Sequence, residues 1–97
     1  MVERERDREL AAERALIEQA RTALARDKSA DALAALAEHA REHPRGQLEE
    51  EREALQILAL TASGRVDEAR AGAARFRERF PKSVHWHQIR AALGTER

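Results

Sequence analysis

The chain has 97 residues, of which 37% are charged and only 3% are aromatic. This length suits one small domain, whose core must come mainly from leucine, isoleucine, alanine and a few rings. Eighteen basic and eighteen acidic residues cancel, which argues against a nucleic-acid-binding protein, because such proteins usually carry a net basic face.

No stretch approaches the ~20 consecutive apolar residues that a membrane-spanning helix needs. The N-terminus is charged rather than apolar, so we predict no signal peptide and no direct membrane insertion. Cysteine is absent, which excludes a disulfide framework and is compatible with the cytoplasm or the periplasm. We expect a soluble domain, as part of a larger bacterial protein, in a compartment that the sequence leaves open.

The first predicted element is a helix. Residues 1–9 are a charged helical extension in which acids and bases alternate and which buries almost nothing. From Leu10 an apolar stripe begins with the three- and four-residue spacing of one helix face, and this helix should end near Arg26. The stripe consists of Leu10, Leu16, Ile17, Ala20, Ala23 and Leu24.

A turn at residues 27–29 leads to a second helix, which stops before Pro44 because proline cannot donate the helical hydrogen bond. Residues 10–44 are therefore expected to form a first helical hairpin. The third helix opens with acids near its positive end and finishes at Ser63 and Gly64. The positions expected to be buried are Leu33, Leu36, Ala37 and Ala40 in the second helix and Leu48, Leu55, Leu58, Ala59 and Ala62 in the third.

The fourth helix follows Gly64 and ends before Pro81, which completes a second hairpin over residues 46–81. Its apolar stripe consists of Val66, Ala69, Ala73, Phe76 and Phe80. A fifth helix is predicted over residues 83–94, with Ser83 as its cap and Trp86, Ile89 and Leu93 as its apolar face. We expect this helix to cover the open end of the stack as a capping helix, within a single all-α domain, residues 1–97.

The two hairpins share their spacing. Ala69 and Pro81 recur 37 residues upstream as Ala32 and Pro44, and a period of this size is typical of stacked helical hairpins. Over about residues 17–93 the chain resembles the tetratricopeptide-repeat family, which implies a right-handed stack of antiparallel hairpins whose first helices line a concave binding surface. Residues 76–83 are also similar to segments of bacterial envelope proteins with such repeats, including outer-membrane assembly lipoproteins and the Tol–Pal-associated coiled-coil protein.

Histidines are the candidate metal ligands, namely His39, His43, His85 and His87. His39 and His43 are four residues apart and project from one helix face, but the glutamate of the zinc-protease helix is missing between them. The 37-residue offset places them where the second hairpin has Phe76 and Phe80. We therefore predict that they pack at a helix–helix seam, where a partly buried imidazole would make the local packing respond to mildly acidic pH.

No pattern predicts catalysis. Serines 29, 63 and 83 fall at predicted turns, where helix capping explains them, and none lies in a nucleophile-elbow motif. The acids at residues 49–53 open a helix that is dense in arginine rather than lining an apolar cleft. The glycines are too scattered for a phosphate loop. We predict neither catalytic residues nor a cofactor.

The favoured function is a non-catalytic protein–protein interaction module, a scaffold or adaptor that binds a protein or peptide. The predicted contact residues are Glu49, Arg52, Glu53 and Gln56 on the third helix, together with Trp86. Their mixed charge indicates polar, salt-sensitive recognition. Two alternatives stay open: a structural oligomerisation or spacer domain of an envelope or regulatory protein, which includes a homo-oligomer, and a histidine-based metal-binding sensor or enzyme.

Overall fold

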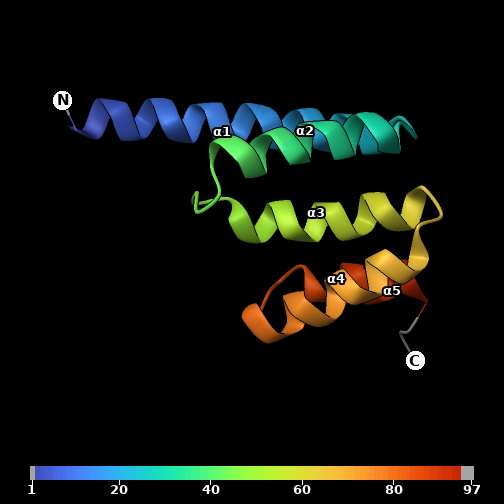
Figure 1. Ribbon diagram of the computed structural model, residues 1–97. Coiled ribbons are helices and arrows are strands. Elements are labelled where there is room, and N and C mark those ends of the chain that lie inside the picture. The colour runs from blue at the N-terminus through green and yellow to red at the C-terminus, as the bar shows by residue number, and fades with distance from the viewer. Residues whose placement is uncertain (1, 95–97) are drawn as a thin grey trace.

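The computed structural model describes residues 2–94, and this part of the chain contains five helices and no strand. The helices are α1 (Val2–Ala25), α2 (Ser29–Glu42), α3 (Glu49–Ala62), α4 (Val66–Arg79) and α5 (Trp86–Leu93). Short loops join them into antiparallel neighbours, as Figure 1 shows. The predicted all-α class with a short final helix is confirmed.

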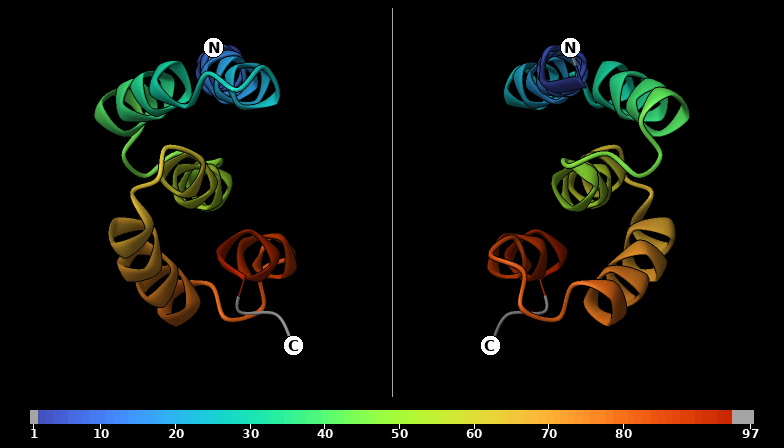
Figure 2. Two further views of the ribbon diagram at one scale, coloured as in Figure 1. Left: turned by 90° about the vertical axis from the view of Figure 1, so that its right-hand side faces the viewer. Right: turned by 90° about the vertical axis from the view of Figure 1, so that its left-hand side faces the viewer.

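The helices form two rows. Seen end-on, α1, α3 and α5 lie along one side of the molecule and α2 and α4 along the other (Figure 2). The central helix is α3, which packs against each of the other four. None of the helices within residues 2–94 is long and apolar enough to cross a membrane.

The core consists of two clusters that meet at α3. The first joins α1, α2 and one face of α3. The second joins another face of α3 to α4 and α5. Because α3 is covered on several sides, it buries Ala54, Ile57 and Leu60 in addition to the predicted Leu55 and Ala59. A single predicted stripe does not describe a central helix; the expected positions Ala37 and Ala62 are exposed.

The backbone repeats at an offset of 37 residues. The helices α2 and α4 begin at Ser29 and Val66, and both contain 14 residues. The preceding turns share a left-handed residue, with φ of 59° at Asp27 and 83° at Gly64. Each turn is closed by a backbone hydrogen bond between residues five positions apart. The Lys28 N–H donates to Ala23 O at 2.8 Å, and the Arg65 N–H donates to Leu60 O at 2.9 Å.

The two ends of the stack are built differently. Residues 2–9 form the first turns of α1, which extend past α2 and are exposed (Figure 1). At the other end, α5 begins 37 residues after α3, but the positions of Ala54 and Ile57, with which α3 packs against α4, are taken in α5 by Ala91 and Gly94. The helix α5 therefore lacks an equivalent of the Ile57 side chain, with which α3 packs against α4.

Candidate functional site

Glu13 is a buried carboxylate that projects from α1 into the loop between α2 and α3. Only 3% of its surface is exposed. Its oxygens accept backbone hydrogen bonds from the Gln47 N–H and the Leu48 N–H, each at 3.2 Å. A Cβ at Gly46 would lie 2.0 Å from Glu13 Oε1, so the carboxylate can reach the loop only because residue 46 has no side chain.

His39 connects Glu13 to Arg52. The ring is completely buried; its Nε2–H donates to Glu13 Oε1 at 2.9 Å, and its Nδ1 accepts from Arg52 Nη1 at 3.2 Å. Arg52 Nη1 also donates to the His43 carbonyl at 3.2 Å. This arrangement requires a neutral imidazole with its hydrogen on Nε2.

Electrostatics keep the ring neutral and the carboxylate ionised. Burial and the nearby Arg52 cation together lower the pKa of His39, and they outweigh the opposite effect of Glu13. Burial by itself raises the pKa of Glu13, but its hydrogen bonds with Leu48, His39 and Gln47 outweigh burial, so the pKa is lowered. One negative and one positive charge are therefore held inside the protein on the two sides of a neutral ring.

The burial of Arg52 corrects a prediction, since this residue was expected on the binding surface. It is 6% exposed, and it faces α2 because its guanidinium finds acceptors on His39 and His43. The signal that sequence reasoning missed lies at the 37-residue offset, where Ile89 corresponds to Arg52. Ile89 is predicted and found in the core, so its equivalent position is an interior one.

The predicted correspondence of His39 and His43 with Phe76 and Phe80 is confirmed. The histidine rings lie 5.4 Å apart, centroid to centroid, and are tilted by 43°. The phenylalanine rings lie 5.2 Å apart and are tilted by 48°. Trp86, a predicted contact residue, is half-buried and stacks on Phe76 at 6.5 Å. Its ring therefore contributes to the packing of α5 on α4.

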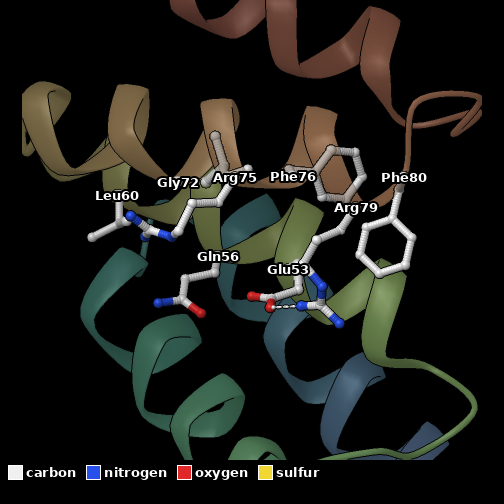
Figure 3. A pocket seen from close by; sticks show the side chains of 9 residues that line it. Glu53, Gln56, Leu60, Gly72, Arg75, Phe76, Arg79 and Phe80 are labelled. Atoms are coloured by element: carbon white, nitrogen blue, oxygen red, sulfur yellow. Dashed lines mark hydrogen bonds and ion pairs between the residues drawn. The ribbon is translucent and has the colours of Figure 1, made fainter.

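A cleft, here called the α3–α4 groove, opens between those two helices (Figure 3). It is lined by Glu53, Gln56, Ile57 and Leu60 from α3 and by Gly72, Arg75, Phe76, Arg79 and Phe80. Gly72 lies where the helices cross closely, because a Cβ there would lie 3.3 Å from Ile57 Cγ1. The predicted residues Glu53 and Gln56 thus line a real cleft.

The rim of the α3–α4 groove is polar. Arg79 Nη1 donates to Glu53 Oε1 at 3.0 Å, as Figure 3 shows, and Arg79 Nη2 pairs with Glu49 at the edge. The side chains of Arg75 and Gln56 lie opposite each other and have no hydrogen-bond or ion-pair partner within residues 2–94. These two groups are available to a ligand.

A second concave surface, here called the α1–α3–α5 groove, lies on the other side of α3. It is lined by Arg21, Leu24, Ala25, Leu55, Leu58, Gln88, Ala91 and Ala92. The floor is the half-buried Leu58, and the α5 wall is made of Gln88 and two alanines. None of the four residues predicted on α3 faces this groove.

Within residues 2–94 no group of three histidine, aspartate or glutamate side chains is placed to hold a metal ion. Both ring nitrogens of His39 are engaged by Glu13 and Arg52. No family model, curated protein or solved structure matches the chain. The geometry of the two grooves and of the buried network is therefore the basis for a functional assignment.

Proposed function

We propose that the chain is a non-catalytic protein-binding module that holds a peptide segment of a partner in the α3–α4 groove. The observation that carries the proposal is an apolar cleft rimmed by two polar side chains, Arg75 and Gln56, that the described chain leaves without partners. The 37-residue recurrence of the hairpins supports a tetratricopeptide-like assignment within this proposal.

The size of the cleft favours a peptide side chain over a metabolite. Its volume is about 90 Å³, whereas pockets for small molecules and cofactors measure roughly 300–1,000 Å³. Such a cleft accommodates one apolar side chain against Leu60 and Phe80, while neighbouring acceptor groups of the peptide bind Arg75 and Gln56. Recognition of this kind is weakened by salt because the arginine is exposed.

The test is a selection from a displayed library of random peptides at pH 7.5, with the 97-residue chain as the target. Gln56→Trp places a bulky ring over the α3–α4 groove, and Gln88→Trp is a matched change, also at an exposed helical glutamine, in the α1–α3–α5 groove. We expect the Gln56 variant to weaken the selected peptides at least tenfold and the Gln88 variant to change them less than twofold. Binding that Gln56→Trp leaves intact contradicts the proposal.

A second candidate function is self-association through the α1–α3–α5 groove. It is favoured by the partly exposed Leu24 and Leu58, next to alanines that let a second copy approach closely. Molar mass measured by light scattering from 5 to 500 μM separates the candidates. A dimer that Leu58→Glu dissociates supports self-association, and a constant monomer contradicts it.

A further inference from the structure

The neutral ring of His39 is a hydrogen-bond acceptor at only one atom, and that atom faces a cation. Nδ1 accepts from Arg52 Nη1 at 3.2 Å, while Nε2–H donates to Glu13. A second proton on the ring would occupy Nδ1 and convert this acceptor into a donor. Arg52 would then face an N–H group and a positive charge, so it would have to leave Nδ1.

A carboxylate of α3 lies close to the displaced guanidinium. Arg52 Nη2 lies 4.0 Å from Glu53 Oε1, and this same oxygen accepts the hydrogen bond from Arg79 Nη1 at 3.0 Å. An approach of Arg52 therefore brings a second guanidinium to the oxygen that holds Arg79, which repels Arg79 and divides the attraction of the carboxylate between two cations. Glu53 and Arg79 both line the α3–α4 groove (Figure 3), so this repulsion occurs at its rim.

The charged groups around the His39 ring determine the pH at which it takes up a second proton. The helix α2 packs against α1 and α3 in the described chain. The titratable and charged groups facing the network are Glu13 from α1, His43 from α2, Arg52 and Glu53 from α3, and Arg6, Glu9 and Arg45 beside Glu13. Glu13 favours the second proton, while burial, Arg52 and His43 oppose it, so the pKa of His39 lies below the ordinary 6.5. The ring therefore takes up its second proton at a lower pH than an ordinary histidine does.

We infer that the Glu13–His39–Arg52 network makes the α3–α4 groove responsive to pH, because protonation of His39 moves Arg52 toward Glu53 and loosens the Glu53–Arg79 pair at the rim. The effect on ligand affinity rests on the proposed function. The movement of the rim itself does not rest on the proposed function, because it is expected in the chain without ligand.

The first experiment therefore uses the ligand-free chain. NMR spectra between pH 8 and pH 5 follow the His39 ring together with the Arg79 side-chain Nε–H and the Glu53 carboxyl carbon. We expect the two rim signals to shift with the same midpoint as the ring. Rim signals that stay constant while His39 titrates overturn the inference, whether or not any peptide binds.

The second experiment uses a peptide without histidine that was selected at pH 7.5. Such a peptide fits the rim as it stands with a neutral ring, so we expect its affinity to fall at least fivefold at the pH where the NMR titration shows His39 to be protonated. His39→Gln keeps one donor and one acceptor but does not titrate, and it should reduce the change to less than twofold. His87→Gln, at an exposed histidine of α5, should leave the fivefold change in place.

The outcomes separate the two claims. If the response to pH persists in His39→Gln, another group causes it and the inference is wrong, although the groove still binds the peptide. If no peptide depends on the groove, the proposed function fails, and the NMR titration alone decides whether His39 controls the rim.

Discussion

Each hairpin packs against the helix that follows it through equivalent backbone positions. The side chains at these positions are polar in the first case and largely apolar in the second. In the first, the polar seam of Glu13, His39 and Arg52 links α1, α2 and α3. The equivalent residues 37 positions later are Glu50, Phe76 and Ile89. We call them the apolar seam because its two buried members are Phe76 and Ile89. Here Phe76 and Ile89 are buried without any polar partner, and they contribute to the second core cluster.

The glutamates show how much the environment changes an identical residue. Glu13 is buried and accepts three hydrogen bonds. Glu50 is only half-buried, and the Ser83 hydroxyl donates to it at 2.6 Å. The apolar seam gains its stability from removing rings and aliphatic groups from water. The polar seam must offset the desolvation of two charges, so it depends on every partner being present. The comparison therefore predicts that substitutions in the two seams lower the free energy of unfolding by different amounts.

The largest effect is expected from removing the carboxylate of the polar seam. Glu13→Ala leaves Arg52 as a buried cation without its counter-charge, which should lower the free energy of unfolding by about 3–5 kcal/mol. The matched change Glu50→Ala in the apolar seam should cost about 1 kcal/mol or less. Urea unfolding at pH 7.5 measures both. Equal losses at the two positions would show that the seams are not held differently.

A smaller effect is expected from converting one seam into the other in steps. His39→Phe introduces the ring of the apolar seam but leaves buried groups of Glu13 and Arg52 unsatisfied, which should cost about 2–4 kcal/mol. Adding Arg52→Ile removes the buried cation that lost its hydrogen-bond acceptor. Isoleucine is the residue at the equivalent position, Ile89. We expect the double variant to regain at least about 1 kcal/mol over the His39→Phe single variant.

A double-mutant cycle of unfolding free energies tests this expectation. Simple addition of the two single costs would mean that His39 and Arg52 do not act as a unit.

The two seams should also differ in their response to acid. The lowered pKa of His39 means that the unfolded chain binds more protons below pH 6.5, so stability falls as pH decreases from that value toward the folded pKa. The lowered pKa of Glu13 adds a second loss below pH 4.5. Unfolding free energies from pH 8 to pH 4 measure the slope. His39→Phe/Arg52→Ile should abolish the first loss, and an unchanged slope between pH 7 and pH 5 would contradict the assignment.

The smallest effect is expected at a helix crossing where the two hairpins use side chains of different size. The first hairpin has two alanines there, and the second has one large and one absent side chain. Ala20 and Ala35 of the first hairpin correspond to Ile57 and Gly72 of the second. Gly72→Ala gains about 1 kcal/mol of helix propensity, but its Cβ would lie 3.3 Å from Ile57. The two terms offset each other, so the net change in unfolding free energy should stay within about 1 kcal/mol. A loss above about 2 kcal/mol would mean that the crossing cannot widen at all.

Much of the fold could be predicted because the signals are local. Proline and glycine mark the ends of the helices, and the stripe of Ala69, Ala73 and Phe76 is buried as its spacing indicates. The 37-residue offset also predicted that His39 packs in the interior. The candidate surface was predicted only in part, since Glu53 and Gln56 line a groove while Arg52 does not. Arg75 of α4 and Phe80, which directly follows α4, also line the groove, and no sequence signal predicted that they would meet residues of α3.

The sequence by itself determined the five helices, their antiparallel order and their repetition, because turns and apolar spacing act over a few residues. Only the tertiary structure decided the chemistry inside. It brought Glu13 within hydrogen-bonding distance of His39, 26 residues away in the chain, and it surrounded α3 on several sides. Arginine and glutamate are interior residues only when a partner and a backbone loop satisfy them, and three-dimensional packing alone supplies such partners.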